Sequence, residues 1–180
     1  MIHPFTFTAP TDKMPGAWHG AYLKPYALLF AALKDTEDSI FEAGVDGAGS
    51  LLMYADYFHR SKPFGMDISP EPHALKGQQR IKFYQGDAYS PKGFETIRAH
   101  APFALCVDDG PHTISSQITF CQRYPTLLSE NGLAICEDVQ HIGDFVELSR
   151  ALPPDFFGFG IDLRMHDGRY DNLVFVITRR

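Results

Sequence analysis

Short apolar segments alternate with amphipathic ones along most of this chain. The apolar segments hold four to six residues and end at polar or glycine positions, which is typical of strands buried in a parallel sheet. Between them, apolar residues recur three and four positions apart, as on one face of a helix. This alternation predicts a mostly parallel sheet with helices on both faces. The expected strands are 39–43, 63–68, 81–85, 103–107 and 133–136.

The amphipathic segments predict helices between and after these strands. One follows the first strand, with Leu51 and Phe58 on its apolar face, and two short ones lie around 94–98 and 145–148. Helical spacing after the fourth strand continues as far as Leu128, and we expect Asn131-Gly132 to break that helix.

The two ends of the chain depart from this alternation. Residues 1–16 have no apolar period and form an irregular arm in our interpretation, and helical spacing follows over 18–33. Near the C-terminus, 157–165 and 172–178 are strand-like and flank an Asp-Gly turn sequence, which predicts a hairpin. The predicted fold is a doubly wound, Rossmann-like α/β domain. Its seven-stranded sheet is mostly parallel and includes a C-terminal antiparallel hairpin.

Composition adds limits to this picture. At 180 residues and 44% hydrophobic content, the chain fits a single globular domain, with an arm and helix over 1–38 and the core over 39–180. The net charge of −6 and the lack of a basic stripe argue against nucleic acid as the main partner. The longest apolar run near the start is too short to span a membrane, and because no basic region followed by an apolar one opens the sequence, we expect no secretory signal.

Cysteine usage points to a reduced compartment. The chain has three cysteines without CxxC spacing, which fits a cytoplasmic protein. Cys106 and Cys136 fall inside apolar runs, so we expect them to be small core residues.

Each of the five expected strands carries an acidic side chain at or near its C-terminal end. In open α/β sheets the ligand crevice lies outside the carboxyl ends of the strands, so these acids predict a binding site there. Each acid taken alone is equally compatible with a helix cap or a turn. The acids are Glu42, Asp67, Asp87, Asp108 with Asp109, and Glu137 with Asp138.

A glycine-rich turn over 44–50 joins the first strand to its helix. Glycines let the backbone approach a ligand closely, and the helix start offers free N–H groups. Asp67 lies 23 residues after Gly44, where a doubly wound fold holds ribose hydroxyls. The glycine-rich turn is also compatible with a tight strand-to-helix connection that binds no ligand. Asp67 is also compatible with an ordinary turn residue before Ser69-Pro70.

These motifs together resemble those of class I S-adenosylmethionine-dependent methyltransferases. Within that class they resemble the macrolide and sugar O-methyltransferases and the related cephalosporin hydroxylase-like proteins, over residues 39–180. The motifs are Phe41-Glu42-Ala43-Gly44-Val45, Phe64-Gly65-Met66-Asp67-Ile68, Gln85-Gly86-Asp87, Val107-Asp108-Asp109-Gly110-Pro111-His112 and Asn131-Gly132-Leu133-Ala134-Ile135-Cys136-Glu137-Asp138.

The resemblance implies a cofactor site for S-adenosylmethionine. The turn after the first strand would cradle the methionine part, and Asp67, with Ile68 beside it, would bind the ribose. Asp87 and the Ala88 backbone would read the adenine edge, and Asp108 would close its strand next to the cofactor. The residues of the methionine cradle are Glu42, Gly44, Gly47, Gly49 and Ser50.

The resemblance also implies a metal ion and a general base. Asp109 and Asp138, with Glu137, would hold a divalent ion, and Mg²⁺ suits such an all-oxygen set. His112 would take the proton from a substrate hydroxyl, a role that an imidazole can fill near neutral pH. We therefore expect O-methylation of a hydroxylated small molecule such as a natural product or sugar.

Departures from the family pattern leave alternatives open. Pro111 stands where a serine is usual, and Ala88 where a glutamine is frequent. The 38 residues before the first strand are expected to supply a helix and an arm but no roof for the pocket. Either the acceptor is small, its specificity differs, or a second subunit closes the site, and the aromatic arm favours a homodimer. The spare histidines near the crevice are His19, His141 and His166.

Two other functions compete with this one. An NAD-dependent oxidoreductase would use the same glycine turn and ribose acid, although the Gly-Asp after the third strand and the terminal hairpin argue against it. A non-catalytic module that binds S-adenosylmethionine and serves as a partner subunit is also compatible with Pro111 and the missing lid.

Overall fold

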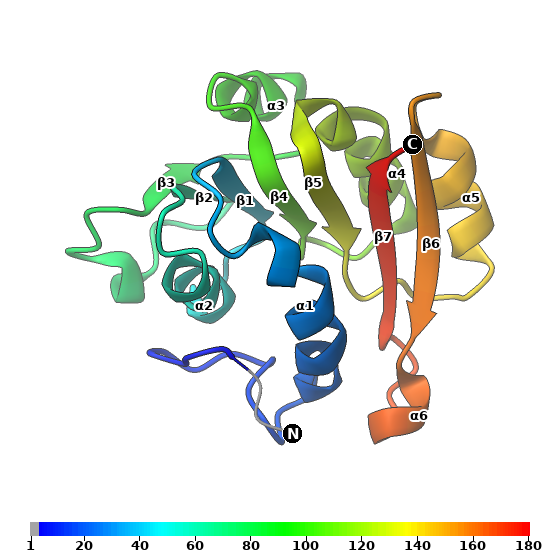
Figure 1. Cartoon of the computed structure of the whole chain (residues 1–180), viewed down its shortest axis with the longest axis horizontal. Coiled ribbons are helices and arrows are strands. Elements are labelled where there is room, and N and C mark those ends of the chain that lie inside the picture. Colours follow the sequence, from blue (N-terminus) through cyan, green and yellow to red (C-terminus); the bar gives the residue numbers. More distant parts are fainter. Residues whose placement is uncertain (1–3) are drawn as a thin grey trace.

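The computed structural model describes residues 4–180 and contains one seven-stranded sheet (Figure 1). The strand order is β3-β2-β1-β4-β5-β7-β6, and β1 to β5 are parallel. β7 runs opposite to the other six strands, so it pairs antiparallel with both β5 and β6. This confirms the predicted doubly wound fold. The strands are β1 (Ser39–Ala43), β2 (Pro63–Asp67), β3 (Lys82–Gln85), β4 (Phe103–Asp108), β5 (Leu128–Cys136), β6 (Phe156–Asp162) and β7 (Leu173–Arg179).

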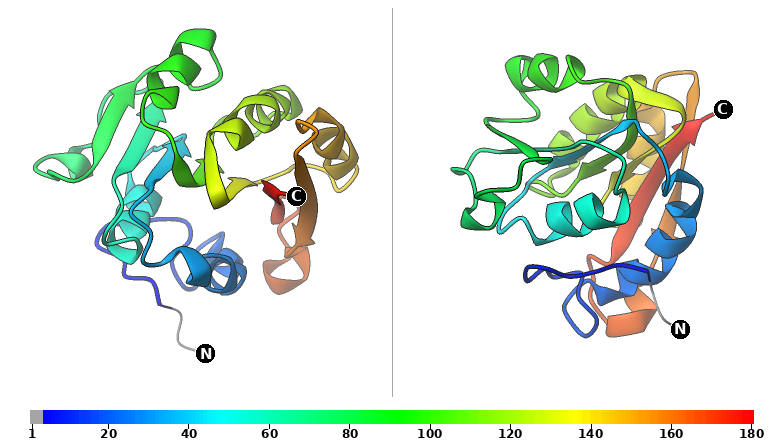
Figure 2. Two further views of the ribbon diagram at one scale, coloured as in Figure 1. Left: turned by 45° about the horizontal axis from the view of Figure 1, so that its top comes forward. Right: turned by 60° about the vertical axis from the view of Figure 1, so that its left-hand side comes forward.

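Helices cover both faces of the sheet. In the right panel of Figure 2, α1 and α2 lie on one side and α3, α4 and α5 on the other. Period-two alternation along the central strands divides the core accordingly, because neighbouring residues face opposite sides. Phe41 packs with the side of α3 to α5, whereas Ile40 packs with α1 and α2. The helices are α1 (Leu23–Leu29), α2 (Gly49–Tyr57), α3 (Pro91–Arg98), α4 (Ile114–Arg123), α5 (Asp144–Ala151) and α6 (Arg164–Asp167).

The helix expected as far as Leu128 ends earlier, so that prediction is wrong. α4 stops at Arg123, a 3₁₀ turn follows over Tyr124–Leu127, and Leu128 already begins β5. Pro125 in that turn has no N–H for a continuing helical ladder. Asn131 and Gly132 therefore lie inside β5 rather than breaking a helix.

The C-terminal strands pair as predicted, but their connection differs. β6 ends at Asp162, and α6 with the residues after it separates β6 from β7, so no two-residue turn joins them. Gly168 adopts φ +73° and ends α6 rather than forming the centre of a hairpin turn. The strand expected over 157–165 is shorter for the same reason.

The N-terminal arm is irregular, as predicted, but it packs into the chain's own core. Phe5 is buried against Phe30 and Tyr57. Tyr22 is also buried, whereas Trp18 is 70% exposed and lies off the apolar stripe of the following helical segment. The aromatic arm is thus mostly internal, and the homodimer stays a prediction. No helix among the described residues has the length and apolar character needed to cross a membrane.

Candidate functional site

A cavity of about 630 Å³ opens at the carboxyl ends of the parallel strands. The glycine turn, the ends of β2 and β3, and the loops after β4 and β5 all contribute to its walls. This is the crevice expected of an open α/β sheet. The predicted cofactor residues that line it are Gly44, Gly47, Gly49, Ser50, Asp67, Ile68, Asp87 and Ala88.

Gly44 lets the turn after β1 lie directly against the loop after β4. Its φ is +82°, and a Cβ at this position would lie 2.0 Å from the backbone oxygen of Asp109. Only glycine fits such an approach. Gly49 similarly contacts the N-terminal arm, since a Cβ there would lie 2.1 Å from the carbonyl oxygen of Pro10. The two glycines thereby bring three segments together around the cavity.

Asp67 fixes the same turn from the end of β2. Its carboxylate accepts hydrogen bonds from the backbone N–H groups of Val45 (2.8 Å), Asp46 (3.2 Å) and Ser69 (2.8 Å). Burial would raise the pKa of Asp67, but these donors outweigh it and lower the pKa. Asp67 is therefore an ionised acceptor at the cavity wall.

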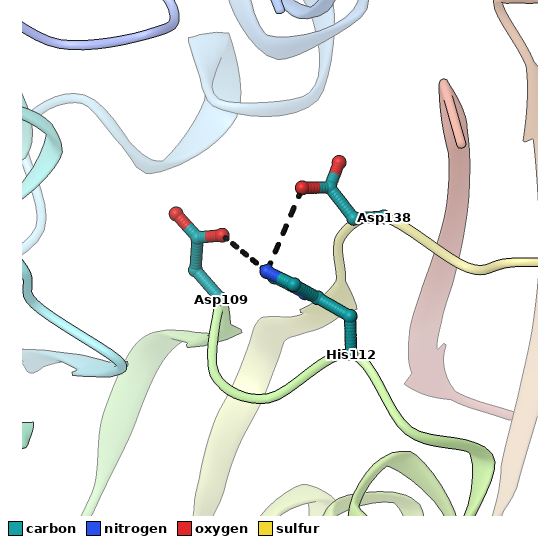
Figure 3. A group of neighbouring side chains, drawn as sticks. All are labelled: Asp109, His112 and Asp138. Atoms are coloured by element: carbon teal, nitrogen blue, oxygen red, sulfur yellow. Dashed lines mark ion pairs between the residues drawn. The ribbon is translucent and has the colours of Figure 1, made fainter. Parts of the chain in front are cut away.

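Three side chains from the loops after β4 and β5 converge, as Figure 3 shows, and all three line the cavity. His112 Nε2 lies 4.0 Å from Asp109 Oδ1 and 3.8 Å from Asp138 Oδ2. One ligand atom from each residue falls within 4.8 Å of the others. We call Asp109, His112 and Asp138 the outer acid group. His112 and Asp138 have φ values of +52° and +51°, a backbone conformation that non-glycine residues adopt only where the surroundings impose it.

Behind this group, a lysine from the N-terminal arm is fully buried among the acids. Lys13 Nζ lies 2.7 Å from Glu137 Oε2 and 2.7 Å from Asp109 Oδ2. Tyr26 and Tyr54 donate their hydroxyls to Glu137 Oε1. We call Lys13 and Glu137 the inner ion pair. Sequence reasoning missed Lys13, because a single lysine in a polar arm carries no pattern that marks it as buried.

The strand ladder explains why Asp109 and Glu137 meet. The N–H of Asp109 donates to the carbonyl of Ala43, and the N–H of Glu137 donates to the carbonyl of Asp108, so pairing continues one residue beyond β4 and β5. Alternation then turns both side chains toward the face of α1 and α2, where Lys13 lies. Burial would lower the pKa of Lys13, but Asp109 and Glu137 outweigh it and raise the pKa. Burial likewise opposes ionisation of Asp109, but Lys13 lowers its pKa.

Asp138 is held by two residues that precede α1. Tyr22 donates its hydroxyl to Asp138 Oδ1 at 2.5 Å, and His19 Nδ1 lies 3.1 Å from the same oxygen. Burial, reinforced by the charge of Asp109, raises the pKa of Asp138. His19 is thus a buried neighbour of the outer acid group, whereas His141 and His166 are exposed.

Glu42 and Asp108 lie behind the cavity wall rather than in it. Glu42 is fully buried, and burial with the nearby charge of Asp109 raises its pKa to about 8. Asp108 accepts the hydroxyl of Tyr89, and burial raises its pKa to about 6. Their assignment to the cofactor stays a prediction, and in this structure neither lines the cavity.

The N-terminal arm contributes to the wall of the cavity, while the expectation that it supplies no roof stays a prediction. Pro10, Thr11, Asp12 and Trp18 contribute to the wall. The arm reaches this position because it packs on Gly49 and is anchored by Lys13. No signal in the sequence reports a contact between segments this far apart.

Sequence comparison relates the chain to methyltransferases. No protein-family model matches it. It is 30% identical over 138 residues to 8-demethyl-8-(2-methoxy-alpha-L-rhamnosyl)-tetracenomycin-C 3'-O-methyltransferase of Streptomyces olivaceus, covering 72% of this chain and 34% of that protein. It is also 30% identical to demethylmacrocin O-methyltransferase of Streptomyces fradiae, covering 63% of this chain and 30% of that protein. The chain thus spans about a third of the length of these curated relatives.

Structural comparison gives the same group. The MycE methyltransferase of the mycinamycin pathway, solved in complex with Mg, SAH and mycinamycin VI, matches with a TM-score of 0.60 and 26% identity. That match covers 65% of this chain and 32% of MycE. A second MycE structure, with Mg and SAH, has a TM-score of 0.66 at 20% identity over 87% of this chain and 48% of that one, and supports the fold.

Proposed function

We propose that this chain, which belongs to the class I S-adenosylmethionine-dependent methyltransferases of the macrolide and sugar group, methylates a hydroxyl of a small molecule with the help of Mg²⁺. One observation carries the proposal. The glycine turn, Asp67 and Asp87 share a single cavity with the outer acid group. A methyl donor held by the first set would therefore lie next to a proton acceptor in the second.

The residues present fit S-adenosylmethionine in their chemistry. Gly47 borders the cavity with open space where a side chain would be, so a ligand can lie close to the backbone of the turn. Asp67 offers an ionised carboxylate to ribose hydroxyls, and Asp87 and Ala88 border the same cavity for the adenine edge.

The residues also fit a divalent ion. Mg²⁺ binds through one or two carboxylates and keeps several waters, and Asp109 and Asp138 offer two carboxylates at the cavity. When bound there, Mg²⁺ would supply positive charge beside the acceptor hydroxyl and ease the loss of its proton.

His112 is the proton acceptor in this proposal. Its Nε2 faces both carboxylates of the outer acid group, so these stabilise the imidazolium that forms when the hydroxyl proton arrives. S-adenosylmethionine held by the glycine turn and Asp67 would supply the methyl group to the deprotonated oxygen, and S-adenosylhomocysteine would leave as the C–S bond breaks. The chain contributes orientation by holding donor and acceptor in one cavity.

An exposed aromatic residue at the cavity and the relatives support the proposed class of acceptor. Trp18 is exposed, lines the cavity and has the guanidinium of Arg169 4.8 Å from its ring centre. An aromatic ring at the entrance suits a sugar or another ring compound. The named relatives methylate such compounds, which supports a hydroxylated natural product or sugar.

Calorimetric titration tests this proposal directly. S-adenosylmethionine should bind and NAD should not, in parallel titrations with Mg²⁺ and with EDTA. Methyl transfer is then measured over a panel of hydroxylated glycosides. Binding of NAD without S-adenosylmethionine contradicts the methyltransferase assignment and favours an oxidoreductase. Cofactor binding without transfer to any acceptor favours a non-catalytic module.

A matched pair of variants locates the cofactor. Asp67→Asn should weaken S-adenosylmethionine binding by about tenfold, because a charge-assisted hydrogen bond becomes a neutral one. Asp56→Asn removes the same charge from an exposed position on α2 and should leave the affinity unchanged. Equal affinities of both variants for S-adenosylmethionine would mean that the ribose does not bind at Asp67.

A further inference from the structure

The inner ion pair is the most unusual feature of this site. It places a buried lysine against Glu137, which the resemblance implies to be a metal ligand. Lys13 has no exposed surface, and Glu137 is 1% exposed. Lysine and glutamate are almost never buried in this way unless they are paired. The pair is therefore a built part of the acid cluster.

We propose that Lys13 is an internal cation of the acid cluster and that it takes Glu137 out of the metal site. The proposal deepens the proposed function, because it concerns the metal site of the same cavity. Glu137 serves as counter-ion of Lys13, and a divalent ion binds only at the outer acid group. Lys13 is thus a positioning residue that holds Asp109 from behind.

The contacts of Glu137 support this assignment. One of its oxygens faces Lys13 at 2.7 Å, and the other accepts the hydroxyls of Tyr26 and Tyr54. All three partners lie on the buried side of the carboxylate, and Glu137 does not line the cavity. An ion at Glu137 would have to displace the ammonium group and enter this closed pocket.

Asp109 connects the two groups through its two oxygens. Oδ2 faces Lys13 at 2.7 Å, whereas Oδ1 lies on the side of His112. Lys13 therefore fixes the orientation of this carboxylate and leaves one oxygen for the cavity. With Asp138, the chain presents two carboxylates to a divalent ion, which is sufficient for Mg²⁺ with its waters.

Titration of the cofactor-free protein with MgCl₂ compares two adjacent isosteric variants. Asp138→Asn should weaken Mg²⁺ binding by about tenfold or more, because it removes one of two charged ligands. Glu137→Gln should change the affinity by less than about threefold, since Glu137 is not a ligand in this proposal. An equal loss in both variants would overturn it and make Glu137 a ligand.

Removal of Lys13 gives the complementary measurement. Lys13→Met keeps the length and the apolar stem but leaves Glu137 and Asp109 without their cation. MgCl₂ should then raise the melting temperature of Lys13→Met more than that of wild type, because the freed carboxylates gain a cation only from solution. An equal or smaller rise would overturn the proposal. Lys34→Met, which removes an exposed lysine, is the control.

The two proposals fail in different ways. If wild type binds no Mg²⁺ but Lys13→Met does, Lys13 is the internal cation, but the outer acid group is not a metal site and the metal-assisted reaction is wrong. If neither binds Mg²⁺, the assignment of Lys13 is wrong, while binding of S-adenosylmethionine still tests the methyltransferase function separately. Should Lys13→Met fail to fold, the pair Glu137→Gln and Asp138→Asn decides the question alone.

Discussion

Glu137 of the inner ion pair and Asp138 of the outer acid group are neighbours in the chain and both buried, but only Asp138 borders the cavity. Glu137 continues the ladder of β5, so its side chain turns toward α1 and α2 and is buried with Lys13. Asp138, one residue later, leaves the extended conformation at φ +51° and borders the cavity. An acid at a strand end is therefore not a ligand by position alone. The direction of its side chain decides whether it binds a ligand or an internal cation.

The largest effect should come from the outer acid group and concern activity. His112→Ala should lower turnover by about 10²–10⁴-fold, the usual contribution of a general base, and leave the affinity for S-adenosylmethionine unchanged. Turnover is measured on an acceptor identified in the panel. His141→Ala, at an exposed histidine, is the control. Unchanged turnover in His112→Ala would remove its role as base and leave the outer group as a metal site only.

The next effect concerns the close contact between Gly44 and the backbone of the loop after β4. Gly44→Ala should cost about 4 kcal/mol of stability, because its Cβ would enter the backbone of the loop that carries Asp109 and its φ is positive. Gly47→Ala, with no atom within 4 Å of its Cβ position, should cost far less. Chemical denaturation measures both. Similar losses would mean that the close approach at Gly44 is not needed for the fold.

Glu42 should show its buried position through the pH dependence of stability. Its pKa is about 8 in the folded state, against an ordinary value near 4.5. Between these values the folded state keeps a proton that the unfolded state has lost, so the free energy of unfolding falls as pH rises and levels off above pH 8. Glu42→Gln should remove about 4 kcal/mol of this decline, measured as the difference between the free energies of unfolding at pH 5 and pH 8.5.

The control for this experiment is Glu147→Gln, at an exposed position on α5. It should keep the decline of wild type. If Glu42→Gln declines with pH as steeply as wild type, Glu42 is ionised in the fold and another group carries the dependence.

The smallest effect should come from the inner ion pair, and we expect it to change stability alone. Tyr26→Phe removes a hydroxyl that donates to buried Glu137 and should cost about 1–2 kcal/mol, a fall in melting temperature of about 2–8 °C. Its affinity for Mg²⁺ should match wild type. Tyr170→Phe, at an exposed tyrosine, should change neither quantity. A large loss of Mg²⁺ affinity in Tyr26→Phe would erase the distinction between the two groups.

Local pattern was enough to predict most of the fold. Apolar runs and helical spacing placed β1 to β5 and their order along the chain, and strand polarity placed the acids at one edge. The pattern failed at Leu128 and at Asp167-Gly168, where short apolar and turn signals fit two structures equally well. At Leu128 the sheet decided, because strand pairing with β4 outweighs local preference. At Asp167-Gly168 the pairing of β6 with β7 has already stopped at Asp162 and Leu173, and α6 occupies the connection.

The sequence by itself determined the sheet, the glycine turn and the set of acids that end its strands, because these follow from periodicity and from residues close together in the chain. Only the tertiary structure decided which acids border the cavity and which are paired internally. Lys13 and Asp109 are 96 positions apart, and Tyr22 and Asp138 are 116 apart. Such contacts depend on where the N-terminal arm packs against the folded sheet, and no local pattern encodes that packing.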